Sequence, residues 1–159
     1  MKKNFILFTF LIVVGFFGAI NSAHAETEVK GIINEDITWG IDGSPYIITG
    51  NILVNSGANL TIEPGVIVKF RKHLVMGQGL YMKIDGTLTA RGTQNNIIKF
   101  TAEDPALNTE FSWGSISFTR QSQSWNSGNN TGSIIEHSII EYGSNDSYPE
   151  NEGRGVISI

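Results

Sequence analysis

The sequence of 159 residues contains no cysteine and no cluster of basic residues. Without cysteine, a disulfide framework and a lipid-modified cysteine anchor are both excluded, so stability must come from packing and backbone pairing. The formal net charge is −4, from 11 basic and 15 acidic residues. This balance argues against a nucleic-acid partner and against binding to anionic membranes. Beyond residue 25 no window has a helical hydrophobic period, which leaves an all-β fold.

Residues 1–25 have the features of an export signal. Two lysines open the chain, residues 5–20 form an almost unbroken apolar run, and Ala23-His24-Ala25 places small residues at the cleavage positions. An uncleaved membrane anchor is the alternative, because the run has about the minimum length for spanning a bilayer. The polar residues after the run favour cleavage after Ala25. We therefore expect a secreted or cell-envelope protein of bacterial type, with no membrane contact after cleavage.

Short period-2 apolar runs between Gly, Asn and Pro residues predict strands from Ile47 onward. Four of these runs end alike, at Phe70, Phe100, Phe118 and Tyr142, which are 30, 18 and 24 residues apart. A degenerate repeat with a period between 20 and 50 residues indicates stacked repeats rather than one globular core.

Two turns decide between antiparallel hairpins and a parallel coil. A two-residue hairpin at Asp85-Gly86 would place the apolar set of one strand on the same face as the polar set of the next. If the chain instead turns a corner and continues, with Gly86 in a left-handed or open conformation, the apolar residues on both sides point inward. Glu63-Pro64-Gly65 behaves in the same way. The sequence therefore predicts a parallel solenoid with about three coils and the start of a fourth.

Several of these runs carry a family resemblance. They are residues 46–54, 60–70, 84–101 (which begins Ile84-Asp-Gly-Thr-Leu-Thr-Ala-Arg-Gly), 113–116 and 133–143. They resemble the right-handed parallel β-helix repeat proteins exported by bacteria, of the pectin-lyase-like superfamily. The resemblance implies a cap at residues 26–46 and β-helix repeats over residues 47–159. Members usually have many more coils, whereas this sequence stops inside an apparent strand, so we expect a truncated product or an open last coil that self-associates.

The resemblance leaves the activity open, because the superfamily includes polysaccharide lyases, glycosidases and adhesins. In its lyases, acidic residues on the sheet bind calcium and an arginine acts as base. No matching acidic cluster is visible here, so the sequence predicts no catalytic residue, no metal site and no cofactor. The acids of the 143–153 loop could ligate calcium, but they lack EF-hand spacing and are as well explained by an acidic loop.

Two further acidic positions have a structural and a functional interpretation. Asp85 could be a functional carboxylate, but its position before Gly86 favours a turn-forming role. Glu136, His137 and Glu141 could form an acid–His–acid set for proton transfer. Strand alternation favours the interpretation that all three are solvated residues on the outer face.

The aromatic residues give the best indication of binding. Trp125 lies among polar amides and hydroxyls, a combination that suits stacking against sugar rings, and Trp113 and Tyr148 lie in or beside the later loops. For Trp113 a packing role is favoured.

Three hypotheses about function follow. The first is an exported, non-catalytic scaffold or adhesive module that contacts a polysaccharide or cell-surface glycan through its loops. The second is the N-terminal part of a polysaccharide lyase or glycosidase whose catalytic coils lie further on. The third is a repeat unit that works only when assembled with other chains.

Overall fold

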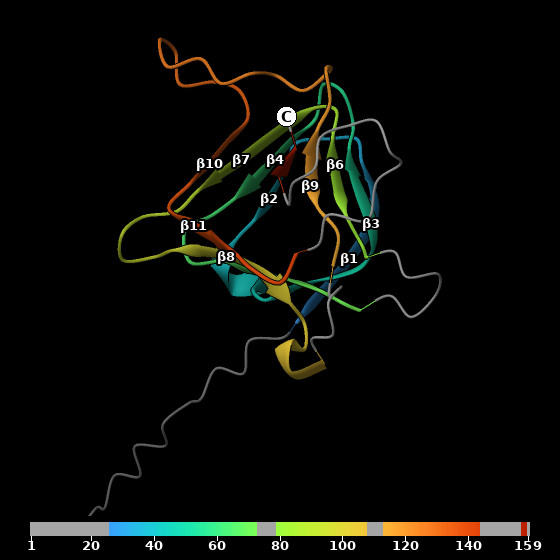
Figure 1. Ribbon diagram of the computed structural model, residues 1–159. Coiled ribbons are helices and arrows are strands. Elements are labelled where there is room, and N and C mark those ends of the chain that lie inside the picture. Colours follow the sequence, from blue (N-terminus) through green and yellow to red (C-terminus); the bar gives the residue numbers. More distant parts are fainter. Residues whose placement is uncertain (1–25, 73–78, 108–112, 144–156, 159) are drawn as a thin grey trace, which may run out of the picture.

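The computed structural model describes residues 26–72, 79–107, 113–143 and 157–158. The chain winds into a parallel β-helix of triangular cross-section (Figure 1). In this view the chain runs counterclockwise from β6 through β7 and β8 to β9 as it approaches the viewer, so the coil is right-handed. The predicted all-β solenoid is therefore confirmed.

The three faces of the triangle are parallel ladders, which we call the A, B and C faces. The A face contains β5 (Ile67–Phe70), β8 (Ile98–Ala102) and β11 (Ser138–Ile140). The B face contains β6 (Met82–Ile84), β9 (Ile116–Phe118) and β12 (Ile157–Ser158). The C face contains β2 (Ile37–Trp39), β4 (Asn59–Ile62), β7 (Thr87–Arg91) and β10 (Ile134–Glu136).

Two longer strands belong to both the A and the B face. The first half of β3 (Tyr46–Val54) pairs with β5 and its second half pairs with β6. Strand β1 (Thr27–Ile33) pairs with β3 along both halves. Two short 3-10 helices, η1 (Ile41–Gly43) and η2 (Pro105–Leu107), lie in the connections. From β3 onward the chain completes three turns, the number predicted, and begins a fourth at β11, earlier than the strand at the end of the sequence where we expected it.

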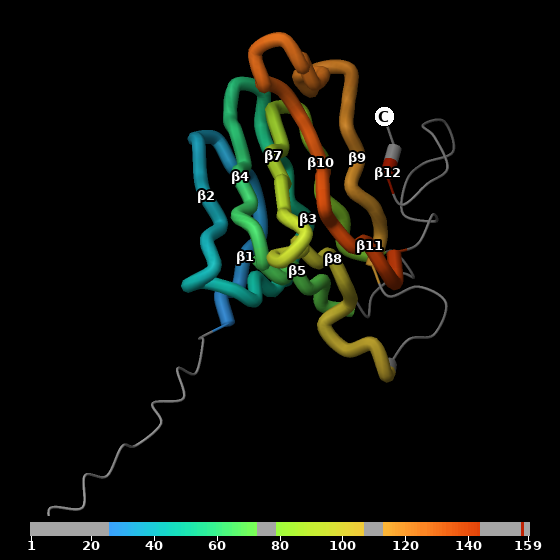
Figure 2. The backbone as a smooth tube through the Cα atoms, turned by 90° about the vertical axis from the view of Figure 1, so that its left-hand side faces the viewer, coloured from blue at the N-terminus to red at the C-terminus, as the bar shows by residue number. Residues whose placement is uncertain are grey.

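The segment that we expected to cap the stack is itself a turn of the stack. Strands β1 and β2 pair in parallel with β3 and β4, so the strand ladders begin at Thr27 rather than at Ile47 (Figure 2). Trp39 on β2 is 2% exposed and stacks on Tyr46, with ring centroids 4.9 Å apart. Trp39 therefore covers apolar residues of the next turn.

The core is a narrow column filled by the inward side chains of successive turns. One ladder pairs Tyr46, Val68, Phe100 and Ile140, and a second pairs Ile52, Met82 and Ile116. Most of these side chains are fully buried, so water is excluded along the axis. Ile135 and Ile140 of the last turn are only partly buried against this core.

Both tested turns are corners, as predicted, because the strands on either side belong to different faces. Strand β4 lies on the C face and β5 on the A face, while β6 lies on the B face and β7 on the C face. Gly65 has φ +84, which is the conformation that its turn requires. The predicted inward parity also holds at Val68, which is 0% exposed. Of the adjacent residues Ile97 and Ile98, Ile98 points inward and is 0% exposed, whereas Ile97 is 43% exposed.

The aromatic repeat, in contrast, is not the structural repeat. Phe100 pairs with Val68 and Ile140, whereas Phe70 pairs with Ala102. Phe118 lies on the B face, so the run that ends there does not correspond to the A-face runs that end at Phe70 and Phe100. Tyr142, the last of the four aromatic residues, has φ 60 and is 41% exposed. Loops of different lengths between the strands break the period, since the A-face partners Tyr46, Val68, Phe100 and Ile140 are 22, 32 and 40 residues apart.

Candidate functional site

A polar cleft of about 350 Å³ lies along the corner between the B and C faces. Corresponding corners of successive turns line it, and Figure 2 shows these corners aligned along the top of the stack. The volume is within the range of small-molecule and sugar sites. The lining residues are Asp36, Ser56, Gly57, Ala58, Asn59, Asp85, Gly86, Thr87, Thr89, Gln121, Gln123, Asn130, Thr131 and Gly132.

The floor of the cleft is made by tightly stacked corners. The Asn59 N–H donates to Asp36 Oδ1 at 2.9 Å, and the Thr87 N–H donates to the Ala58 carbonyl oxygen at 2.9 Å. A Cβ atom on Gly86 would collide with the carbonyl oxygens of Asn55 and Ala58. Close approach of the turn below therefore requires glycine here, and the left-handed conformation that we considered for Gly86 is not the reason, because its φ is not positive.

The wall of the cleft is the loop between β9 and β10, residues 119–133, which backbone hydrogen bonds hold in place. The Gln123 N–H donates to the Gly86 carbonyl oxygen at 3.3 Å, and the Ser133 N–H donates to the Gln123 carbonyl oxygen at 2.8 Å. Asn126 and Thr131 exchange two backbone hydrogen bonds, which close the tip of the loop. The cleft is therefore preformed rather than assembled on binding.

Hydroxyl and amide groups continue the site across the outer side of the C face. Thr89 Oγ1 donates to Asn59 Oδ1 at 3.3 Å, and Asn59 Nδ2 donates to Thr61 Oγ1 at 3.3 Å. Because these side chains come from adjacent parallel strands, they form a row at the strand spacing. Such a row offers directed donors and acceptors to a polyhydroxylated ligand.

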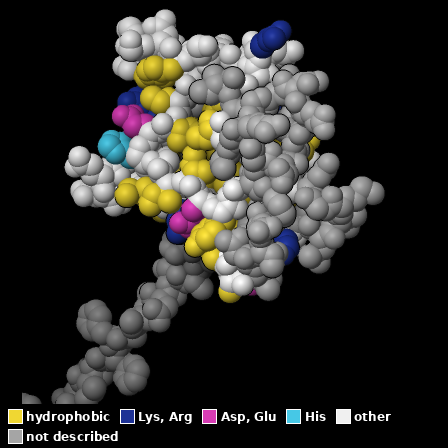
Figure 3. Space-filling view, viewed as in Figure 1, with side chains coloured by type: hydrophobic (Ala, Val, Ile, Leu, Met, Phe, Trp, Pro, Cys, Tyr) yellow, Lys and Arg dark blue, Asp and Glu magenta, His cyan; other side chains and the backbone are white. Residues whose placement is uncertain are grey.

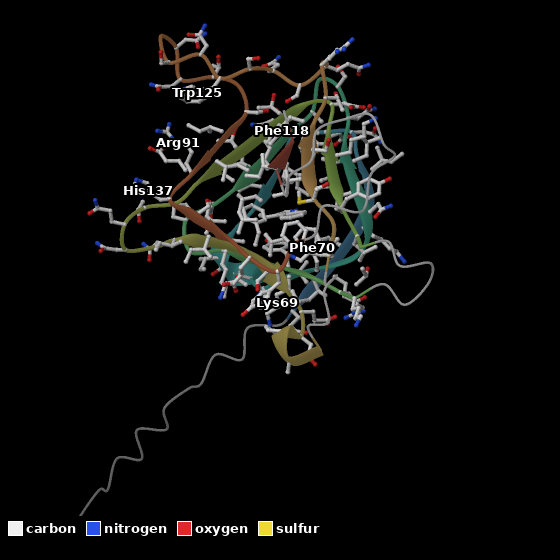
Figure 4. All side chains as sticks on the ribbon, in the orientation of Figure 1. Lys69, Phe70, Arg91, Phe118, Trp125 and His137 are labelled. Carbon is white, nitrogen blue, oxygen red and sulfur yellow. The ribbon has the colours of Figure 1, made fainter. Side chains whose placement is uncertain are left out.

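Trp125 lies on the side of the loop that faces Arg91 (Figure 4). Its ring is half-buried, and the Arg91 guanidinium carbon lies 5.3 Å from the ring centroid. Arg91 Nε in turn donates to Glu136 Oε2 at 2.9 Å. The residue that we expected to contact a ligand therefore has one ring face engaged by a cation. Trp125 belongs to the loop that forms the wall of the cleft, but it is not itself among the lining residues.

The other two aromatic candidates have different positions. Trp113 is 0% exposed, stacks on Phe70 with centroids 4.0 Å apart, and donates its indole N–H to the Glu141 carbonyl oxygen at 2.8 Å. Trp113 therefore has the packing role that the sequence favoured, and no face of its ring is free to contact a ligand. Tyr148 lies outside the described residues, as do the acidic positions of the 143–153 loop.

The acidic candidates do not converge on one point. Asp85 Oδ1 accepts a hydrogen bond from Thr119 Oγ1 at 2.8 Å and lies 3.6 Å from Lys83 Nζ, so it ties its corner to the next turn. Glu136 and His137 are neighbours at the end of the C face, whereas Glu141 pairs with Lys99 at 2.6 Å beyond the A-face strand β11. The acid–His–acid set is therefore split between two faces.

The comparison with protein-family models decides the family. Residues 31–157 match the model described as a pectate-lyase-like beta helix domain. The chain belongs to this family. Searches of the curated proteins and of the solved structures gave no match.

Within this pectate-lyase-like β-helix protein, no group of three or more His, Cys, Asp or Glu side chains in the described residues is placed to hold a metal ion. The described part of the chain also has no helix long and apolar enough to cross a membrane.

Two carboxyl groups of this β-helix protein have lowered pKa values. The shifts have structural causes, and both groups lie away from the cleft. Two hydrogen bonds of 2.9 Å from the Arg71 guanidinium lower the pKa of Glu103. Hydrogen bonds from Lys99 and Thr101 lower the pKa of Glu141. Both carboxylates stabilise neighbouring turns of the stack, which gives them an explanation other than proton transfer.

We expect the free energy of unfolding of Glu103→Gln to fall less between neutral and acidic pH than that of the unsubstituted protein. Because the folded-state pKa of Glu103 lies below the usual value of 4.5, its contribution is fully present above pH 4.5 and is lost as the pH falls through the lowered pKa. Urea unfolding from pH 7 to pH 3 would show a smaller pH dependence in the variant. The same substitution at exposed Glu35 is the control, and an unchanged slope for Glu103→Gln would contradict the prediction.

Sequence analysis identified Asp85-Gly86 as a corner and residues 122–127 as a polar loop, but it did not bring them together. It missed Asp36, Asn59 and Thr89 as members of the site. The available signal was the recurrence of Asn, Asp, Ser and Gly at the turns 55–59 and 85–87, which are in register in this family member.

Proposed function

We propose that this chain is an exported, non-catalytic β-helix module that binds glycans in the cleft at the B–C corner. The observation that carries the proposal is the preformed cleft of about 350 Å³, lined by threonine, asparagine and glutamine side chains from successive turns. Sugars are recognised by such arrays of hydroxyl and amide groups next to an aromatic ring. The export signal predicted at residues 1–25 would place the module outside the cytoplasm, where it meets polysaccharides.

The non-catalytic part of the proposal rests on how the carboxylates of the cleft are used. Asp36 accepts the Asn59 N–H, and Asp85 is held by Thr119 and Lys83. A general acid or base must be within reach of a substrate proton and free to exchange its own. Both carboxylates instead have structural partners, which favours binding over turnover.

We expect Trp125→Ala to weaken retention of the secreted protein on immobilised glycans by about two- to tenfold, because one aromatic contact of this kind is worth about 0.5 to 1.5 kcal/mol. Affinity electrophoresis in gels containing a single polysaccharide would measure the effect. Tyr142→Ala is the matched control, since Tyr142 is an exposed aromatic that follows the A-face strand β11, whereas Trp125 lies in the loop that forms the wall of the cleft.

Unchanged retention in Trp125→Ala would remove Trp125 from the site. To test the cleft itself, Thr87→Tyr would fill it from the lining, and we expect this variant to lose retention while folding normally. Release of shortened polysaccharide by the purified protein would overturn the non-catalytic proposal and support the lyase or glycosidase alternative.

A further inference from the structure

The charges around the cleft limit which glycans it can accept. Among its lining residues are two carboxylates, Asp36 and Asp85, and no Lys, Arg or His. The other lining groups are hydroxyls, amides and backbone atoms. A ligand that lies in the cleft therefore meets hydrogen-bonding groups and negative charge, but no lining cation.

Two of the three basic residues near the cleft are already paired with acids. Lys83 Nζ lies 3.6 Å from Asp85 Oδ1, and Arg91 is bound by Glu136 and covered by Trp125. Arg120, which precedes the lining residue Gln121, is exposed to solvent and is not part of the lining. A ligand carboxylate could recruit Lys83 or Arg91 only by breaking one of these ion pairs.

We infer that the cleft selects neutral, hydroxyl-rich glycans and discriminates against polyuronates, including the pectate of the family description. The inference rests on the proposed function and specifies its ligand class. A uronate carboxylate that enters the cleft loses part of its hydration without gaining a cationic partner, and this loss is costly. A neutral sugar hydroxyl exchanges its water hydrogen bonds for those of Asn59, Thr89 and Gln123 without such a loss.

The test compares two ligands with the same sugar backbone, polygalacturonate and its methyl-esterified form, in which each charged carboxylate is replaced by a neutral ester. Affinity electrophoresis of the purified secreted chain at low ionic strength, with EDTA and separately with calcium chloride, gives an apparent affinity for each. We expect the ester to bind at least about tenfold more tightly under both conditions. Equal or tighter binding of polygalacturonate, including binding that depends on calcium, would overturn the inference.

A third ligand, a neutral β-glucan, separates failure of the inference from failure of the proposed function. Retention on the β-glucan but not on polygalacturonate supports the inference even if the ester does not bind. Retention on polygalacturonate alone leaves a glycan-binding module and overturns only the charge selectivity. Retention on none of the three polymers overturns the proposed function and the inference together.

A gain of binding would locate the selectivity in the cleft. Thr87→Lys places a cation in the lining, and we expect it to raise affinity for polygalacturonate relative to the ester about five- to tenfold at low salt. Thr49→Lys, which adds the same charge at the corner between the A and B faces, is the matched control. Equal gains in both variants would mean that overall charge, rather than the cleft, sets the preference, and would overturn the inference.

Discussion

Ile98→Asp is expected to unfold this protein, whereas Ile97→Asp is expected to leave it folded. Ile98 is 0% exposed inside the column and Ile97 is 43% exposed on its outside, although the two residues are identical and adjacent. A carboxylate at position 98 would have no partner in the apolar interior, and an unpaired buried charge costs several kcal/mol. That cost is comparable to the whole stability of a domain of this size.

Urea unfolding followed by far-ultraviolet circular dichroism measures both variants on the same scale. We expect Ile98→Asp to show no cooperative transition and Ile97→Asp to shift the midpoint only slightly. Val68→Asp, at another fully buried position of the A face, should behave like Ile98→Asp. Unfolding by Ile97→Asp together with a normal transition for Ile98→Asp would reverse the parity of β8.

Trp113→Ala is expected to destabilise the protein by about 3 to 5 kcal/mol, because a fully buried tryptophan leaves a large cavity when it is truncated. Trp113 stacks on Phe70 (Figure 4) and fills space in the core, because the residue paired with Phe70 in the next strand of the A face is the small Ala102. Trp113→Phe keeps the ring stack but leaves the Glu141 carbonyl oxygen without its indole donor, so we expect an intermediate loss of about 1 to 3 kcal/mol.

The matched control is the same substitution in the loop. Trp125→Ala removes a half-buried ring and one cation–π contact, which is worth about 0.5 to 1 kcal/mol at an exposed site. The two tryptophan variants should therefore separate stability from glycan retention, with Trp113→Ala changing the first and Trp125→Ala changing the second. Equal losses of stability would mean that Trp125 also belongs to the core.

The end view of the stack bears on the self-association expected from the sequence. Apolar side chains are visible at the centre of the end nearest the C-terminus (Figure 3). Among the described residues there, Phe118, Ile135 and Ile140 are only partly buried. Self-association through this end stays a prediction, which size measurement of the secreted protein would test.

The repeat length could not be predicted from the sequence, and the reason is geometric. In a coil with three faces, any two short apolar runs resemble each other whether they lie on the same face or on different ones. The run ending at Phe118 was grouped with those ending at Phe70 and Phe100, although β9 belongs to the B face. Only backbone pairing assigns a strand to its face, and the loops between the strands vary too much in length for spacing to reveal that pairing.

The sequence by itself determined the class of fold, the corners and the inward residues. Alternation has a period of two, so a corner that preserves parity and a hairpin that reverses it make opposite predictions at Asp85-Gly86 and at Glu63-Pro64-Gly65. Local patterns of this kind are decided by a few consecutive residues. The inward positions in the strands that flank these corners, such as Val68, could be predicted for the same reason.

The tertiary structure alone decided where the candidate site lies. Asp36, Asn59, Thr89 and Gln123 are spread over four turns, and each looks like an ordinary turn or surface residue in its own segment. They meet because the turns stack in register, which brings equivalent corners together whatever the length of the loops between them. The same stacking buries Trp113 and leaves Trp125 beside the cleft, since burial depends on what lies in the next turn and not on the neighbouring sequence.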